Sequence, residues 1–300
     1  MVALILLLLI GGVLVYLAGM KAGAGLSPVI PGVGEKVAVI RIDSSISSTQ
    51  GGVLGAQYSV DAYVKVIDEA RRDPTVKAVV LVFNSPGGEA GAAEKLYYAV
   101  LKLAENKTVV AYADGLMASG AYEAALPARE IVASPSSLVG AVGVYSVVFN
   151  VHELLGKLGV RVYTFKSGPL KDVGSPFRNM TEADARVMQD MVDRLFEIFK
   201  NRVTKHRPRV SAEVFTGRPY VAGEALKAGL IDKVGTLDDA IRDAKRLAGL
   251  PENAPVVEMR PPTPGLLDVL FGGAYSRGPM VVPSQAYLAM WPPPAAVLPP

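Results

Sequence analysis

Apolar and polar residues between positions 36 and 250 follow two periodicities in turn, one typical of buried strands and one typical of amphipathic helices. Short apolar runs predict strands at 36–42, 77–83, 108–113, 130–133, 142–149 and 160–165. Helical spacing predicts helices at 59–73, 153–157, 181–203, 222–228 and 237–248, and one more that carries Ala93, Leu96, Val100 and Leu103 on one face. Near-continuous apolar strands that alternate with helices predict an α/β fold with a parallel sheet and right-handed crossovers.

Two of these helices have an internal pattern that can be tested. In the helix at 59–73, helical spacing predicts that Tyr63, Val66, Ile67 and Ala70 are buried. The longest helix should begin with a capping box in which Thr181 pairs with Asp184. Its predicted buried stripe consists of Met188, Met191, Val192, Leu195, Ile198 and Phe199.

The two ends of the chain differ from this central domain. Residues 1–20 are apolar and carry no charge, and such a length spans a bilayer core, so we expect a single N-terminal transmembrane anchor. A cleaved signal peptide, with a site at Ala22-Gly-Ala24, is the alternative. Residues 21–35 form a linker, 36–250 the folded domain and 251–300 a proline-rich tail. We expect this tail to be extended or disordered and to lie on a partner or a membrane surface.

Composition excludes several kinds of chemistry. The net charge is +3 and there is no basic stripe with interleaved aromatic residues, so nucleic acid is not an expected partner. The chain has no cysteine, which excludes disulfides and thiolate sites. His152, at an expected helix start, and His206, in a basic and solvated helix end, are too few to form a metal site without a carboxylate cluster. We therefore expect neither a metal nor another cofactor.

The clearest catalytic candidate is Ser119, which follows the strand at 108–113 and precedes a helix of small residues. Ala118 and Gly120 flank this serine and leave it sterically open. Backbone N–H groups at a helix start lack intrahelical partners and can bind an oxyanion that forms when a hydroxyl attacks a carbonyl. A plain strand-to-helix junction would have the same sequence, so this stretch alone leaves both interpretations open.

A second candidate element is the loop Asn84-Ser-Pro-Gly-Gly88, which ends a predicted buried strand. Two adjacent glycines permit positive φ and close approach of a backbone to a ligand. In open α/β sheets, ligands bind at the carboxyl ends of the strands. The amides of this loop could therefore supply a second oxyanion donor beside that of Gly120, although such a turn also occurs as ordinary punctuation.

If Ser119 is a nucleophile, its base is not expected to be a histidine, and a lysine is the alternative. A lysine acts as a base only as the neutral amine, so its pKa must fall from about 10.4 to roughly 7–8. That fall requires about 4 kcal/mol of differential desolvation. Lys171 lies in a Gly/Pro-rich loop after a predicted strand, but composition does not single it out among the lysines.

Three motifs in order resemble the signal peptide peptidase A family of membrane-anchored serine proteases of the S49 type. They are Asn84-Ser-Pro-Gly-Gly88, Met117-Ala-Ser-Gly120, and Lys166-Ser-Gly-Pro-Leu-Lys-Asp-Val-Gly-Ser-Pro176, which runs on to Arg178-Asn-Met-Thr181. The resemblance covers about residues 36–250. It implies a ClpP/crotonase-like spiral of ββα units.

The resemblance also implies roles for individual residues. Ser119 would be the nucleophile, Lys171 the general base, and Gly88 and Gly120 the oxyanion donors, with Gly87 as an alternative to Gly88. The interval between serine and lysine (171 − 119 = 52) fits this family better than the shorter interval of the related stomatin-cleaving proteases. Family members form rings, octameric where each subunit carries one domain of this size, and a site can take its serine and lysine from neighbouring subunits.

Two positions depart from the family pattern. Glu123 places a charge shortly after the nucleophile, where the family has Ala-Ser-Gly-Gly-Tyr-Tyr. Ala141 stands where the family commonly has a serine that orients the lysine, and Ser146 or water is the expected replacement. A catalytically inactive membrane scaffold that binds apolar segments is therefore the alternative from another functional class.

The function that these observations predict is an endopeptidase that degrades membrane-associated peptides such as cleaved signal peptides. A stomatin-cleaving protease is the alternative with the same chemistry. We expect a single-pass protein of the cell membrane, with its protease domain on the extracytoplasmic side.

Overall fold

The computed structural model describes residues 34–49, 58–261 and 287–290. The chain divides into two units, residues 1–34 and 35–300, and the elements below belong to the second. The expected anchor at 1–20 lies outside the described residues. In the described part of the chain, no helix is both long and apolar enough to cross a membrane.

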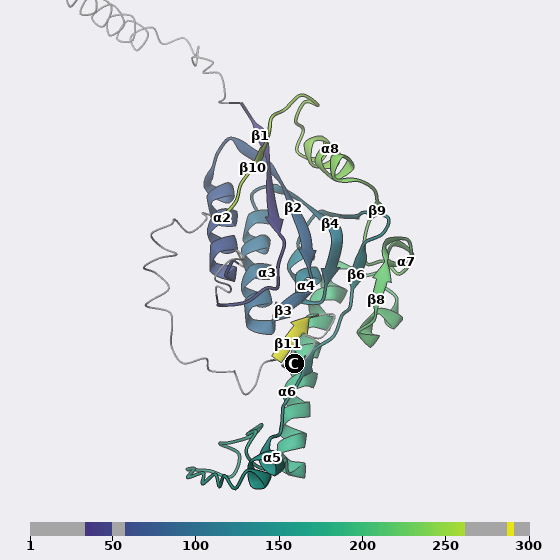
Figure 1. The fold of residues 1–300 in the computed structure, drawn as a ribbon. Helices are drawn as coiled ribbons and strands as arrows, with labels where there is room; N and C mark the ends of the chain where they lie inside the picture. Colours follow the sequence, from purple (N-terminus) through teal and green to yellow (C-terminus); the bar gives the residue numbers. More distant parts are fainter. Residues whose placement is uncertain (1–33, 50–57, 262–286, 291–300) are drawn as a thin grey trace, which may run out of the picture. The chain divides into compact units, whose positions relative to one another are not determined.

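A parallel sheet forms the centre of the domain (Figure 1). Its strand order is β10 (Val256–Glu258), β1 (Lys36–Ile42), β2 (Val76–Ser85), β4 (Thr108–Ala118), β5 (Glu130–Ala133) and β9 (Lys233–Val234). Each neighbouring pair in this order is parallel. The far end of β4 also pairs in parallel with β6 (Leu138–Gly140), which in turn pairs antiparallel with β8 (Pro219–Val221). The predicted α/β fold with a parallel sheet is confirmed.

Helices cover both faces of this sheet, which explains why its strands are apolar almost without interruption. On one face, Ile40, Leu81 and Ala111 pack with α2 (Val60–Arg72), α3 (Ala90–Ala104) and α4 (Gly120–Ala125). On the other face, alternate residues such as Val80 and Val110 pack with α8 (Leu237–Leu247). The predicted buried faces of α2 and α3 are confirmed, down to each residue named above.

The remaining helices lie after β6. They are α5 (His152–Lys157), α6 (Glu182–His206), the 3₁₀ helix η1 (Ala212–Thr216) and α7 (Ala222–Lys227). The N-terminal part of α6, together with α5 and the intervening loops, projects from the sheet domain (Figure 1). We call residues 147–187 the arm. The predicted capping box of Thr181 and Asp184 is present at the start of α6.

Several sequence-based predictions are wrong in the arm and in the segments on either side of it. The predicted strand at 160–165 is absent, and its residues are exposed and irregular. Of the predicted strand at 142–149, only β7 (Tyr145–Ser146) forms. In α6, Met188 and Phe199 are buried as predicted, whereas Met191 and Ile198 are exposed. These apolar side chains lie at the surface of the part of the chain that the structure describes.

The region beyond residue 250 contributes two strands. β10 extends the central sheet next to β1, six residues past the expected domain end. A second, three-stranded sheet has the order β3 (Gly87–Glu89), β11 (Tyr287–Met290) and β7. Sequence reasoning missed both strands, because each is only three or four residues long and lies among prolines.

Candidate active site

Ser119 occupies the sharp turn between β4 and α4, in a conformation that non-glycine residues rarely adopt. Its φ is 53° and its ψ is −121°. The turn is held from both sides: the Ser119 amide donates to the Gly140 carbonyl (N···O 2.6 Å), and the Glu123 amide donates to the Ser119 carbonyl (2.9 Å). The side chain is 1 % exposed, and its hydroxyl donates to the Gly143 carbonyl at 3.3 Å. The surrounding structure therefore fixes the direction of the Ser119 hydroxyl.

A cavity of about 430 Å³ lies next to Ser119. One side is the segment that follows β6, and the other side is α6 with η1. Most of the lining is apolar, including Val142, Val144, Val192, Phe196 and Phe215. The polar residues Gln189 and Asp193 also line it and are joined by a hydrogen bond of 2.7 Å. A cavity of this kind suits an aliphatic or small aromatic side chain.

β3 supplies the glycine loop predicted from the sequence. Gly87 has a positive φ of 91°, and Gly88 lies so close to Ile46 that an added Cβ would be 1.9 Å from the Ile46 carbonyl oxygen. The Gly87 amide donates to the Ser85 hydroxyl at 3.2 Å, and that hydroxyl donates to the Ser44 carbonyl at 2.6 Å. The Gly87 amide is thus bonded within its own turn, whereas Gly88 is paired with Ala289 of β11.

Lys171 lies on the arm, away from the residues that line the cavity at Ser119. Its side chain is exposed and makes no hydrogen bond or ion pair with the described residues. Its own amide donates to the Gly168 carbonyl at 3.2 Å, in a turn of the loop. A single chain therefore does not bring Lys171 to Ser119.

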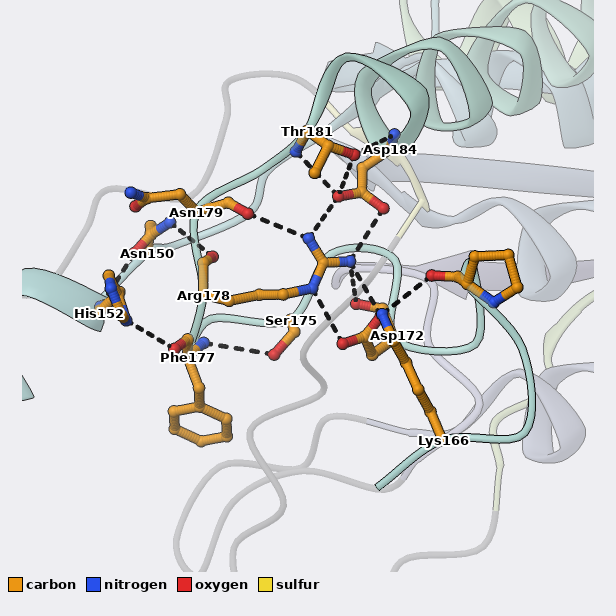
Figure 2. Close-up of polar contacts among 11 residues, drawn as sticks. Asn150, His152, Lys166, Asp172, Ser175, Phe177, Arg178, Asn179, Thr181 and Asp184 are labelled. Carbon is orange, nitrogen blue, oxygen red and sulfur yellow. Dashed lines mark hydrogen bonds and ion pairs between the residues drawn. The ribbon is translucent and has the colours of Figure 1, made fainter. Parts of the chain in front are cut away.

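The loop that carries Lys171 is nevertheless held firmly through Asp172, the residue after Lys171 (Figure 2). Arg178 donates two hydrogen bonds to the Asp172 carboxylate, both at 2.9 Å, and two to Asp184, at 2.5 and 2.9 Å. Lys166 donates to Asp172 at 2.7 Å. The hydrogen bonds from Arg178 are the main reason why the pKa values of Asp172 and Asp184 lie well below the usual range.

This network links the Lys171 loop to the start of α6. Asp184 is buried and accepts bonds from the amide and the hydroxyl of Thr181, both at 2.9 Å, while it also holds Arg178. The same carboxylate thus caps α6 and anchors the loop. Sequence reasoning found the capping box but missed Arg178, because its two acidic partners are each six residues away, outside any helical spacing.

Glu123 does not line the cavity at Ser119. It is 4 % exposed and accepts a hydrogen bond of 2.5 Å from Arg202 of α6. Arg202 also pairs with Glu94 of α3, and its guanidinium lies over the ring of Tyr97, 4.6 Å from the centroid. Burial raises the pKa of Glu123, while the Arg202 contact opposes this rise. The charge therefore ties α4 to α3 and α6, away from the site of chemistry.

Neither histidine lines the cavity at Ser119. His152 begins α5, and its Nδ1 lies 2.9 Å from the Phe177 carbonyl oxygen. His206 is half-buried rather than solvated, with its Nε2 2.9 Å from the Tyr97 hydroxyl. Burial lowers the pKa of His206, and the neighbouring cations Lys205 and Arg207 lower it further. The expectation of a solvated His206 is wrong, because α6 packs this end against α3.

Two hydroxyl groups of β7 are buried without a hydrogen-bond partner among the described residues. They belong to Tyr145 and Ser146. Tyr145 lines the cavity at Ser119, and Ser146 is the next residue of the same strand. Ala141 lines the same cavity and offers no hydroxyl. An unsatisfied buried hydroxyl is uncommon and often marks a place where a further polar group binds.

The parallel α/β fold thus places Ser119 at a strained strand-to-helix turn, next to an apolar cavity. Residues 102–251 match the sequence profile of peptidase family S49, and the chain belongs to this family. A protein of Methanocaldococcus jannaschii that is named as a candidate protease is 40% identical over 232 residues, which are 75% of this chain and 74% of that protein.

Two further relatives are also named as proteases. The chloroplastic serine protease SPPA of Arabidopsis thaliana is 30% identical over 79% of this chain, and Protease 4 of Salmonella typhi is 34% identical over 72%. The matched regions are 36% and 35% of these two longer proteins. A mutant of a membrane-bound stomatin-specific protease has a similar fold, with a TM-score of 0.51 and 16% identity over 76% of this chain and 99% of that one.

Proposed function

We propose that the chain is a serine endopeptidase in which Ser119 is the nucleophile, Lys171 of a neighbouring subunit is the general base, and the amides of Gly88 and Gly120 bind the oxyanion. The backbone of Ser119 is the observation that carries this proposal. Its φ of 53° is enforced by hydrogen bonds on both sides, and its hydroxyl lies at the wall of an apolar cavity. Strain of this kind costs about 1–3 kcal/mol and persists mainly at functional sites.

The chemistry follows from these groups. The neutral amine of Lys171 takes the proton of the Ser119 hydroxyl while its oxygen attacks the carbonyl carbon of a bound peptide. The oxyanion that forms accepts hydrogen bonds from the amides of Gly88 and Gly120, the second of which lies at the start of α4 without an intrahelical partner. The lysine then returns the proton to the leaving amine, and water releases the acyl group from the serine.

The need for a neutral lysine supports a base from a second subunit. A neutral amine at working pH requires desolvation, but Lys171 is exposed on its own chain. Assembly can supply the burial that the single chain lacks. The network of Arg178, Asp172 and Asp184 keeps the loop in one conformation, so that the lysine can be presented to a neighbour without a large loss of entropy.

The surface of the arm supports the same conclusion. Phe165 is 95% exposed and Tyr163 is 73% exposed, and Phe149, Leu158 and Val160 are exposed as well. Large exposed apolar residues in one region indicate an interaction surface. We propose that the arm contacts the next copy of the chain in a closed head-to-tail ring, with eight subunits as the resemblance implies.

Ser146 is the proposed group that orients the lysine in place of a hydroxyl at Ala141. Its buried hydroxyl has no partner among the described residues, so it can accept a hydrogen bond from an incoming ammonium or amine. Because Ala141 lines the cavity without a hydroxyl, no competing hydroxyl is available from that position.

The proposed substrates are membrane-associated peptides with small or aliphatic side chains, such as cleaved signal peptides. The apolar lining of the cavity favours such side chains over charged ones. The apolar segment at 1–20 would hold the enzyme at the membrane, with the protease domain on the extracytoplasmic side. Cleavage of a stomatin-like partner is the second candidate, supported by the fold shared with the stomatin-specific protease.

A mixing experiment tests the shared site. Ser119→Ala and Lys171→Ala proteins should each fold and be inactive towards a labelled signal peptide, and Lys171→Arg should be inactive because a guanidinium stays protonated. The two alanine variants are unfolded, mixed in equal amounts and reassembled. A site then works when one subunit keeps Ser119 and its neighbour keeps Lys171, so about a quarter of the wild-type activity should return.

His152→Ala and His206→Ala serve as controls and should retain activity. If no activity returns from mixtures shown to have co-assembled, both residues come from one subunit and the shared site is rejected. An inactive scaffold would differ further, because a fluorophosphonate probe would then fail to label Ser119 in the wild-type protein.

A further inference from the structure

A second cavity, of about 530 Å³, lies at the edge of the central sheet where the strands begin. Its lining comes from the first residues of β2 and β4, the loop before β5 and the C-terminal ends of α3 and α8. Thr108, the first residue of β4, lines this cavity, whereas Ser119 follows the last residue of the same strand. The two cavities therefore lie at opposite ends of β4 and share no lining residue.

The charges of this second cavity are all of one sign. Its lining contains three cations, Lys77, Lys107 and Arg129, and no acid. Because β2, β4 and β5 are parallel neighbours, their starts lie along one edge, and each cation stands within one residue of a strand start. The Arg129 side chain is exposed and makes no hydrogen bond or ion pair with the described residues. We call this cavity the basic pocket.

The two lysines of the basic pocket are close enough to repel each other. The Lys107 ammonium donates to the carbonyls of Asp73 and Val76, at 2.8 and 2.7 Å, which leaves one of its three N–H groups. Lys77 pairs with Glu35 at 3.2 Å, in an exposed contact that contributes little. Burial lowers the pKa of Lys107, and the like charge of Lys77 lowers it further. An anion that contacts both lysines would relieve this repulsion.

The size of the charge indicates which anion fits. The C-terminal ends of α3 and α8 oppose an anion, since each carries about half a negative charge. The three cations outweigh both ends and leave about +2, or about +1 if Glu35 is counted as well. A phosphodiester carries about −1 and a phosphomonoester about −1.5 to −2 at neutral pH. The basic pocket therefore matches a single phosphate group.

We propose that the basic pocket binds an anionic phosphate group, which Arg129 contacts through its planar guanidinium and the two lysines contact through single N–H groups. A lipid headgroup and free phosphate share this chemistry. The sequence favours the lipid, because only fifteen residues (35 − 20) separate the apolar segment at 1–20 from β1, which begins at the same edge of the sheet. An anchor at 1–20 would keep membrane lipids at a high local concentration. The proposal does not rest on the peptidase activity.

Calorimetric titration of the full chain in micelles of an uncharged detergent tests the basic pocket without requiring hydrolysis. The probes are dioctanoyl-phosphatidylglycerol, which is anionic, dioctanoyl-phosphatidylcholine, whose choline cation cancels the charge, and inorganic phosphate. A cation near a lipid surface contributes about 1 kcal/mol, or about fivefold in affinity. Arg129→Gln should therefore bind phosphatidylglycerol about fivefold more weakly than the wild type, and Arg129→Gln combined with Lys77→Gln about 25-fold more weakly. Arg129→Lys, which keeps the charge, should lie between the wild type and Arg129→Gln.

The matched control combines Arg209→Gln with Lys227→Gln, which removes the same two charges from exposed positions outside the basic pocket. This control should bind phosphatidylglycerol like the wild type, and phosphatidylcholine should bind more weakly to every protein. Urea unfolding should give all variants the stability of the wild type, because the exchanged side chains are exposed. If inorganic phosphate binds as tightly as the lipid and shows the same losses, the phosphate site stands and the lipid is rejected as its source. Unchanged affinity in the pocket variants, an equal loss in the control, or no measurable binding of any probe overturns the proposal.

Discussion

Gly88 is the position where the structure makes the sharpest quantitative prediction. A Cβ at this residue would lie 1.9 Å from the Ile46 carbonyl oxygen, 2.6 Å from its carbon and 2.7 Å from the Ile46 nitrogen. All three are backbone atoms, so no side-chain rotation can relieve the overlap. To bring the shortest distance to 3.0 Å, β3 and the Ile46 segment must separate by at least about 1.1 Å (3.0 − 1.9).

That displacement has two measurable consequences for Gly88→Ala. The hydrogen bonds between Ile46 and the flanking residues of β3, at 2.8 and 2.9 Å, would lengthen. With about 1 kcal/mol for each of the two bonds and about 1–3 kcal/mol for overpacking, we expect a loss of about 3–5 kcal/mol in the free energy of unfolding. The Gly88 amide would also leave the oxyanion position, and loss of one such donor lowers kcat about 100- to 1,000-fold.

The assay compares kcat for a labelled signal peptide and the free energy of urea unfolding at 25 °C. Gly91→Ala is the matched control, since Gly91 lies in α3, three residues away, with nothing within 4 Å of an added Cβ. This control should gain about 0.5–1 kcal/mol of stability and keep its kcat. A folded Gly88→Ala protein with kcat within fivefold of the wild type would show that the Gly88 amide does not bind the oxyanion. Stability equal to that of the control would refute the steric argument itself.

Two further predictions concern groups near the site and on α6. Ser146→Ala should lower kcat about tenfold with KM unchanged, because the lysine loses its orienting hydroxyl. Adding Ala141→Ser to this variant should restore part of the rate. An unchanged kcat in steady-state assays would exclude Ser146 from this role. Burial lowers the pKa of His206 from 6.5 in the folded protein, so the unfolded chain binds a proton first as the pH falls through 6.5. The free energy of unfolding therefore falls by up to about 1.4 kcal/mol per pH unit until the pKa of the folded state is reached. His206→Gln should remove this part of the slope when urea unfolding is measured between pH 7.5 and 5.5, and identical slopes would contradict it.

The sequence predicted the parts of the fold in which apolar residues are buried by other elements of the same chain. The buried faces of α2 and α3 and the central strands β1, β2, β4 and β5 follow periodicity closely, because the packing partners are other elements of the same domain. Where apolar residues are exposed in the described part of the chain, periodicity gave the wrong prediction. The run at 160–165 reads as a strand but is irregular and exposed in the arm.

The candidate site was predictable only in part, for a similar reason. Ser119 and the two glycines of β3 lie at strand ends, where local sequence and fold class together indicate chemistry. Lys171 could be named only through the family resemblance, because its own chain leaves it in solvent. The ion pairs of Arg202 with α3 and α4 connect residues 79 and 108 positions apart, and no local pattern shows such a distance.

The length of α6 has a mechanical consequence. With 25 residues it is about 37 Å long, and it runs as one rod from the capping box beside the arm, past the cavity wall at Gln189 and Phe196, to the Arg202 contact with α3 and α4. Because the Arg202 contacts fix the C-terminal end of α6, a small tilt of the helix at the cavity produces a larger displacement of its N-terminal end in the arm. If copies of the chain assemble through the arm as proposed, a molecule that binds against α6 in the cavity changes the strength of that assembly, and assembly changes the affinity for that molecule by the same factor.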